Sequence, residues 1–116
     1  MDVEQIARVC HEANRALQIE TGFTPVSVGW DDLDEHTRES ACTGVEHVIT
    51  HDPTPQESHE SWSLFKLGAG WRYGPVKDEQ KQEHPNLVPY DELPAVERAK
   101  DSLFGAIVRA LKDVEA

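Results

Sequence analysis

The sequence has few cysteines, few basic residues and no long apolar run. Cys10 and Cys42 lie in no C-x-x-C pair and are too few for a disulfide framework, so we expect reduced, buried thiols. No segment approaches the roughly 18 consecutive apolar residues of a membrane-spanning helix. With 11 basic against 22 acidic residues, the net charge is −11. That charge disfavours nucleic acid and anionic lipid as partners, because both require a basic surface.

Signatures of common enzyme classes are also missing. The chain contains no P-loop, no G-x-G-x-x-G turn and no G-x-S-x-G elbow. His11 and His59 are each followed by glutamate, but neither segment has the second histidine of a zinc-protease helix. We therefore expect a protein that is not an enzyme and has no cofactor or metal site. Hydrolysis through His59 and Glu60 is the enzymatic alternative.

Length and the first residues indicate a single cytoplasmic domain. A chain of 116 residues can bury enough surface to fold as one domain over residues 1–116. The segment MDVEQIARVC is acidic and amphipathic, and it lacks the basic and apolar regions of a signal peptide.

Four amphipathic helices are predicted from apolar spacings of three and four residues. The third has the clearest start, because Thr54, Pro55 and Glu57 fit the N-cap, first and third positions of a capping box. In the last helix, the apolar stripe is predicted to contain Leu103, Ile107, Ala110, Leu111 and Val114. Only PVSV and NLVP look extended, so any sheet is small. The helices are predicted over residues 2–19, over 34–49, from 54 through Ala69, and from Pro94 onward.

The chain nearly repeats itself. CHEANRALQIETGF (10–23) aligns with SHESWSLFKLGAGW (58–71) at an offset of 48 residues, and VGWDDL (28–33) aligns with VPYDEL (88–93) at an offset of 60. The predicted fold is thus α+β and mainly helical, with two pseudo-repeated halves, 1–50 and 51–116, and little β-strand. Such duplicated helix pairs usually pack about a pseudo-twofold axis, which would bring Phe23 and Trp71 to one cleft.

Between the aligned segments the second half carries about a dozen extra residues, which overlap the least acidic part of the chain. Residues 66–84 have a net charge of +1, whereas the rest of the chain carries −12. Trp71 and Tyr73 lie between two glycines, and Arg72, Lys77 and Lys81 are close in sequence. An aromatic face beside basic groups suits an anionic ligand that contains a ring. The alternative is that the two aromatic side chains only cover the core.

Residues 58–111 resemble the RyR domain, the repeat of ryanodine receptors that also occurs as small free-standing proteins of bacteria and phages. The resemblance is carried by H-E-x-W, G-W-x-Y-G-P-V and H-P-x-L-V-P-Y-x-x-L-P. Residues 1–50 match more weakly and lack the G-W-x-Y-G element. The resemblance implies a mainly helical fold, no known catalysis and a ligand cleft between paired repeats, where two tryptophans sandwich an adenine ring. That role falls on Trp71, and the first half offers only Phe23 at the equivalent position.

These observations predict a module that binds an adenine-containing nucleotide, either an ADP-ribose-type or a cyclic signal. The predicted ligand residues are Trp71, Tyr73, Arg72, Lys77, Lys81 and Phe23. A homodimer that brings together two copies of Trp71 is an alternative to the Phe23–Trp71 cleft. In a bacterium the protein would sense the signal, and in a phage it would sequester it. The competing function class is a protein interaction module without a small-molecule ligand.

Overall fold

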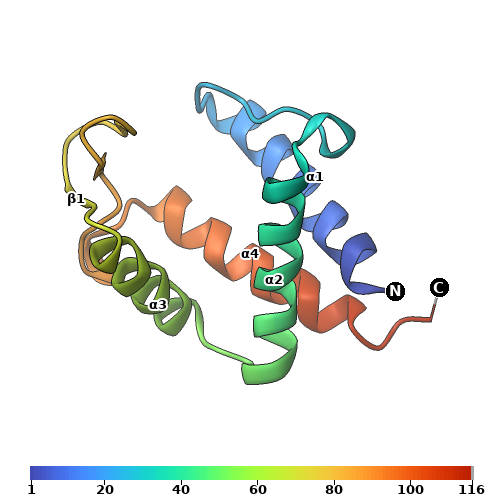
Figure 1. Cartoon of the computed structure of the whole chain (residues 1–116). Coiled ribbons are helices and arrows are strands. Elements are labelled where there is room, and N and C mark those ends of the chain that lie inside the picture. Colours follow the sequence, from blue (N-terminus) through green and yellow to red (C-terminus); the bar gives the residue numbers. More distant parts are fainter. Residues whose placement is uncertain (116) are drawn as a thin grey trace. The chain divides into compact units, whose positions relative to one another are not determined.

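The computed structural model describes residues 1–115, and over these residues the chain is mainly helical (Figure 1). In chain order the elements are α1 (Val3–Thr21), the 3₁₀ turn η1 (Trp30–Asp32), α2 (Glu35–His51), α3 (Pro55–Gly68), β1 (Arg72–Tyr73), β2 (Glu83–His84), the 3₁₀ turn η2 (Tyr90–Glu92) and α4 (Ala95–Leu111). This confirms the predicted mainly helical α+β fold. None of the helices in the described part of the chain is long and apolar enough to cross a membrane.

The chain divides into two compact units. Unit 1 takes in Met1–Asp52 together with the described residues from Ser102 onward, and unit 2 is Pro53–Asp101. Helix α4 therefore contributes its first residues to unit 2 and the remainder to unit 1.

Unit 1 contains a hydrophobic core formed by α1, α2, η1 and the second part of α4 (Figure 1). Val45 and Val108 are fully buried, and Ile6 is 1% exposed. Trp30 is buried among them and belongs to η1. Burying such side chains is worth about 1.5–3 kcal/mol each relative to leaving them in water, so these contacts are the main stabilising term of unit 1.

The start of α3 agrees with the sequence prediction. The Thr54 hydroxyl accepts a hydrogen bond from the Glu57 N–H at 3.1 Å, and the Glu57 carboxylate accepts one from the Thr54 N–H at 2.9 Å. With Pro55 at the first helical position, this is a complete capping box. The first N–H groups of a helix have no partner within the helix. Here those of Thr54 and Glu57 are hydrogen-bonded by the capping box, and Pro55 has no N–H.

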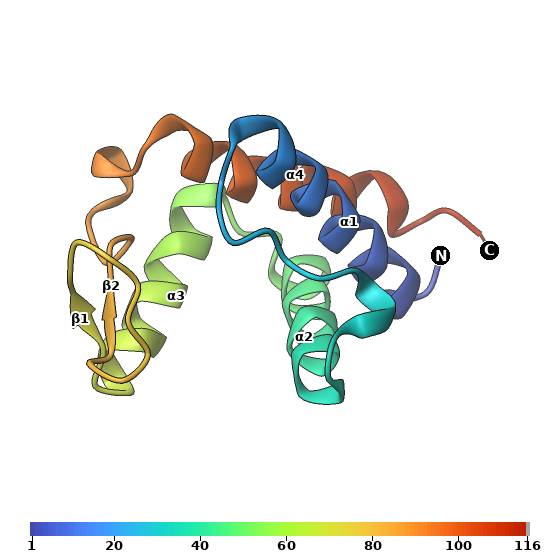
Figure 2. The same ribbon diagram turned by 90° about the horizontal axis from the view of Figure 1, so that it is seen from above.

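The small sheet lies in unit 2, after α3, and not at PVSV or NLVP, for which the strand prediction was wrong. β1 and β2 run parallel, with Arg72 beside Glu83 and Tyr73 beside His84 (Figure 2). Each strand has only two residues, too few for the alternation by which strands are found in a sequence.

The internal repeat is visible in the element bounds. Adding 60 to the bounds of η1 and α2 gives those of η2 and α4. α1 and α3 are followed by Gly22 and Gly70, which have positive φ values of 71° and 94° and stand 48 residues apart. Both offsets are those of the sequence alignment, so the aligned segments fold alike locally.

The inward face of α4 differs from the predicted stripe. Phe104, Ile107, Val108 and Leu111 pack in the unit 1 core. Leu103 and Ala110 are exposed, and Val114 lies beyond the end of the helix and is 43% exposed. Two overlapping sets of apolar residues in this segment have helical spacing. Contacts with the core, and not periodicity, decide which set is buried.

Candidate functional site

Trp71 is fixed directly behind α3 by the turn that ends the helix. The Gly70 N–H donates to the Leu67 carbonyl at 3.1 Å, and the Trp71 N–H donates to the Lys66 carbonyl at 3.0 Å. Gly70 adopts φ 94°, a conformation that a residue with a Cβ rarely takes. The indole is partly buried as a result of this reversal of the chain.

A lysine from α3 lies over this indole. The Nζ atom of Lys66 is 4.5 Å from the ring centroid of Trp71, which is a cation–π contact. The contact joins residues five apart, and it exists because the helix-ending turn folds Trp71 back toward the last turn of α3. A positive charge is therefore positioned at an aromatic face in an otherwise acidic protein.

Further rings continue from Trp71 through unit 2, and we call Trp71, His84, Trp62, His59 and Tyr90 the aromatic row. The His84 ring lies 6.3 Å from Trp71 and 4.9 Å from Trp62, the latter in an edge-to-face arrangement. His59 stacks on Trp62 at 5.7 Å and lies 6.1 Å from Tyr90. Such pairs contribute about 0.5–1.5 kcal/mol each beyond their buried area, so the row gives Trp71 a rigid support.

The loop after Trp71 carries Arg72, Lys77 and Lys81, and we call it the basic loop. It is held by the sheet and by Asp78. The Arg72 N–H donates to the Gln82 carbonyl at 2.9 Å, which fixes β1 against the end of the loop. Asp78 pairs with Glu83 through two backbone hydrogen bonds, and its carboxylate accepts from the N–H groups of Gln80 and Lys81. The segment that carries Lys77 and Lys81 is therefore an ordered turn.

The pKa of His84 is affected by positive charges near the aromatic row. Burial lowers the pKa of His84, the charges of Lys77 and Lys66 lower it further, and the charge of Glu97 raises it. Its Nδ1 accepts a hydrogen bond from the Asn86 N–H at 3.0 Å, so this nitrogen carries no proton. The ring is thus neutral near pH 7, and two ammonium groups act on the ring beside Trp71.

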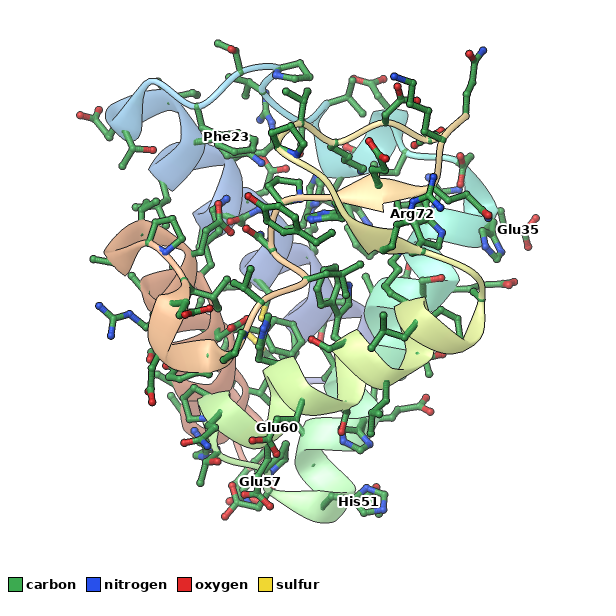
Figure 3. All side chains as sticks on the ribbon, turned by 90° about the vertical axis from the view of Figure 1, so that its left-hand side faces the viewer. Phe23, Glu35, His51, Glu57, Glu60 and Arg72 are labelled. Carbon is green, nitrogen blue, oxygen red and sulfur yellow. The ribbon has the colours of Figure 1, made fainter. Side chains whose placement is uncertain are left out.

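The predicted ligand residues of the second half lie close in the chain but differ in exposure. Tyr73 is 57% exposed. The Arg72 guanidinium, on β1 (Figure 3), is 3.6 Å from the Glu83 carboxylate, and its side chain is 74% exposed. Lys77 and Lys81 are exposed on the Asp78 turn. Of these predicted residues, Trp71 has its ring 6.3 Å from that of His84, and the charge of Lys77 lowers the pKa of His84.

Phe23 is the local counterpart of Trp71. Its N–H donates to the Gln18 carbonyl at 2.9 Å, just as Trp71 donates to Lys66, and it follows a glycine with positive φ. Its side chain is 42% exposed. Phe23 belongs to unit 1 and Trp71 to unit 2, so the shared cleft of the two rings stays a prediction.

Lys66 and His84 were not among the predicted ligand residues. Lys66 was counted only in the local charge balance, and its position five residues before Trp71 signals a contact once the helix is known to end at Gly68. His84 comes to Trp71 through the pairing of β1 with β2, for which the sequence carried no signal.

A separate groove runs along α3, between this helix and residues 87–91, which lead into η2 and form its start. It has a volume of about 560 Å³. Apolar side chains dominate its lining, which consists of Gln56, His59, Glu60, Ser63, Leu64, Leu67, Leu87, Val88, Pro89, Tyr90 and Asp91. Trp71 does not line it. The groove shares His59 and Tyr90 with the aromatic row.

His59 and Ser63 on α3 do not form a general-base pair. The Nε2 atom of His59 lies 2.7 Å from the Val88 carbonyl oxygen and therefore donates its proton there, while Ser63 Oγ is 3.4 Å from the same nitrogen. A nitrogen that already carries a proton cannot accept one from serine. Among the described residues, no group of three or more His, Cys, Asp and Glu side chains could hold a metal ion.

The two cysteines are free thiols. Cys10 is buried in the unit 1 core, and burial raises its pKa to about 11, so it is unreactive at neutral pH. Cys42 is only partly buried, which corrects the expectation of two buried thiols.

Comparison with known families gives one finding. A model of the RyR domain matches residues 44–112, which is more than half of the chain. The match takes in the last turns of α2 and all of α3, the sheet, η2 and α4. It contains the whole aromatic row and the basic loop, and it leaves α1 and η1 outside.

Proposed function

This chain belongs to the RyR domain family, and from that premise we propose that it is a non-catalytic binding module for an adenine-containing nucleotide. The ligand class is an ADP-ribose-type or cyclic nucleotide signal. The protein acts in the cytoplasm, as a sensor of the signal in a bacterium or as a protein that sequesters it in a phage-infected host.

One observation carries the proposal, namely the positive charge of Lys66 over the indole of Trp71. Lys66 contacts the indole at 4.5 Å, and both Lys66 and Lys77 act on the neighbouring His84. A purine stacks on an indole with about 1–3 kcal/mol per base, and phosphate groups pair with ammonium and guanidinium groups. Such a combination is unexpected for a purely structural tryptophan in a chain of net charge −11.

The proposed division of roles follows from exposure. Trp71, backed by the aromatic row, stacks on the base, and the exposed Tyr73 covers its edge. Arg72, Lys77 and Lys81 reach the phosphates because all three extend into solvent from β1 and the Asp78 turn. The opposite face of the base is covered by Phe23 of the same chain or by Trp71 of a second copy. The second version makes the ligand-bound protein a homodimer.

The first experiment is mass spectrometry of small molecules released from the purified native protein, followed by calorimetric titration with ADP-ribose, ADP and cyclic adenine nucleotides. We expect an adenine compound to be released or to bind. Absence of binding to all of these compounds would refute the proposal. Light scattering at several concentrations separates the two versions, since a monomer that binds one nucleotide per chain excludes the shared Trp71.

The second candidate function is a protein interaction module, and the apolar surface of α3 favours it. Leu64 and Phe65 are each 72% exposed, and Leu67 is 54% exposed. Clusters of exposed apolar side chains of this kind often mark contact surfaces. A protein that binds no nucleotide but loses a protein partner when Leu64 is replaced by Ser would support this function in place of the first.

A further inference from the structure

The groove on α3 has a counterpart in unit 1, because the two repeats fold alike. On the helix, where the offset is 48, Gln56, Glu60 and Ser63 correspond to Arg8, Glu12 and Arg15. On the segment that follows, where the offset is 60, Leu87 and Asp91 correspond to Ser27 and Asp31. The same hydrogen bond anchors both places. His11 Nε2 donates to the Val28 carbonyl at 2.7 Å, as His59 does to Val88. The two grooves can therefore be compared residue by residue.

In unit 1 this groove is bridged by two arginines of α1. Arg15 donates through Nε to the Ser27 carbonyl at 2.8 Å and through Nη1 to the Glu12 carboxylate at 3.0 Å. Arg8 pairs with Asp31 at 3.0 Å. The guanidinium groups thus join the helix to the segment that follows it.

The Glu12 carboxylate completes this closure. It accepts a hydrogen bond from the Trp30 N–H at 3.0 Å, and this bond is the first cause of its lowered pKa, ahead of the contact with Arg15. One carboxylate therefore serves both the arginine and the loop, and the space between α1 and η1 is occupied by the chain's own side chains.

In unit 2 both arginines are replaced and both carboxylates are retained. Serine stands at 63 in place of Arg15, and glutamine at 56 in place of Arg8, while Glu60 and Asp91 keep the positions of Glu12 and Asp31. Over residues 1–115, neither Glu60 nor Asp91 forms an ion pair. Glu60, labelled on α3 in Figure 3, accepts a hydrogen bond from the side-chain amide of Gln56 at 3.1 Å, and from no other residue in the described part of the chain.

The space without arginines in unit 2 is an open, mainly apolar groove. Leu64 takes the position of Ala16 and, with Leu67 and Leu87, gives the groove an apolar floor. Its volume of about 560 Å³ is within the range of roughly 300–1,000 Å³ for ligand sites. An occupant must therefore bring apolar surface for the floor and positive charge for Glu60 and Asp91.

We propose that this groove binds a peptide segment of a partner protein in which an arginine is flanked by apolar side chains. The partner's guanidinium takes the place that Arg15 has in unit 1, between Glu60 and the Leu87 carbonyl, and a second basic group of the partner pairs with Asp91. The apolar side chains lie on Leu64 and Leu67. This site goes beyond the nucleotide proposal and does not depend on it, because Trp71 and the basic loop do not line the groove.

The probe is the peptide Ac-Leu-Arg-Leu-Arg-Leu-NH₂, added to the full ¹⁵N-labelled protein and followed by NMR. We expect shift changes at the amides of Ser63, Leu64, Leu67 and Asp91, with those of the unit 1 counterparts unchanged. The matched peptide with citrulline in place of arginine has the same shape without the charge. It should bind about tenfold more weakly or worse, as should Glu60→Gln and Asp91→Asn with the arginine peptide.

A second variant restores the closure seen in unit 1. In the double variant Gln56→Arg, Ser63→Arg the new arginines should pair with Asp91 and Glu60, raise the melting temperature and abolish peptide binding, while nucleotide binding stays unchanged. Equal binding of the arginine and citrulline peptides, or unaltered binding by the double variant, would overturn the proposal. So would concentration-dependent shifts at the same amides without peptide, since the occupant would then be a second copy of the chain.

Discussion

The imidazole of His59 donates Nε2–H to the carbonyl oxygen of Val88 across 2.7 Å, and this bond ties α3 to the segment that enters η2. The bond from His11 to Val28 has the same length and ties α1 to the segment before η1. Each histidine also contacts the aromatic residue at the start of the 3₁₀ turn, Trp30 or Tyr90. A structural role explains why histidine occurs at both aligned positions.

Removing the histidine hydrogen bond should lower the free energy of unfolding more in unit 2 than in unit 1. His59 is only 6% exposed, so His59→Ala leaves the Val88 carbonyl without its donor in a buried place and should lower the free energy of unfolding by about 1–3 kcal/mol. His11→Ala should cost less, because water can reach the more exposed Val28 carbonyl. Urea unfolding of both variants measures the difference, and equal losses would show that burial is not the reason.

Trp71→Ala should weaken nucleotide binding by about 5- to 150-fold, the equivalent of 1–3 kcal/mol of stacking. The loss should depend little on salt, and Trp71→Phe should recover part of it. Calorimetric titration with melting curves alongside gives the answer. A variant that is badly destabilised by about 3–5 kcal/mol, but whose folded fraction binds normally, would show that Trp71 only fills the core.

Lys77→Ala and Lys81→Ala should weaken nucleotide binding most at low ionic strength. Both side chains are exposed, and charges at the surface are screened over about 10 Å at 0.1 M salt. Titrations at two salt concentrations test this, with Lys112→Ala as the control because it lies outside residues 66–84. If the control reduces affinity as much, general net charge and not the basic loop governs binding.

Gly74→Ala should disrupt the sheet. A Cβ at this position would lie 2.5 Å from the Cβ of Glu83, closer than any tolerated contact, so β1 and β2 would have to separate. We expect a loss of about 1–3 kcal/mol in the free energy of unfolding. Gly68→Ala is the matched control, since a Cβ there meets nothing within 4 Å, and in a helix it should be neutral or gain up to about 1 kcal/mol. Equal behaviour of the two variants would argue against the close approach.

Acidification should lower the stability of the protein because His84 becomes protonated. Its pKa is lower in the folded chain than the ordinary value of about 6.5, so the folded state binds the proton less readily than the unfolded state. The resulting stabilisation is present above about pH 6.5 and is lost as the pH falls through the folded-state pKa. Protonation of Nδ1 would also break the hydrogen bond from the Asn86 N–H.

Urea unfolding of the native protein and of His84→Asn between about pH 7.5 and 5 measures this contribution. The asparagine carbonyl can accept the Asn86 N–H but does not titrate, so the variant should lose less stability over this range. Parallel pH profiles for the two proteins would assign the dependence to carboxylates instead.

The elements that were predicted correctly from the sequence are those that depend on interactions between residues close together in the chain. The Thr54–Glu57 capping box starts α3 where expected, and the offsets of 48 and 60 recover equivalent turns in both repeats. Hydrogen bonds between residues three apart leave a pattern in the sequence. Long-range relations leave none, so the two-residue strands and the contact of His84 with Trp71 were not predicted.

Apolar residues show the same limit. The spacing of Phe65 from Trp62 predicts that both lie on the apolar stripe of α3, yet Phe65 is 72% exposed. Periodicity gives the face of a helix, but the neighbour that covers the face decides burial. For the candidate site, sequence supplied Trp71 and the basic residues around it, and the fold added Lys66, His84 and the groove on α3.

What is repeated in the sequence is not what packs together. Each repeat is a helix, a 3₁₀ turn and a second helix, but Val108 of the second repeat is fully buried with Ile6 and Val45 of the first, while the beginning of its helix belongs to unit 2. A fragment cut between Asp52 and Pro53 would lack Val108 and expose the core of unit 1. The duplicated segment is therefore not an autonomous folding unit, and separating the two pieces at that junction should unfold unit 1.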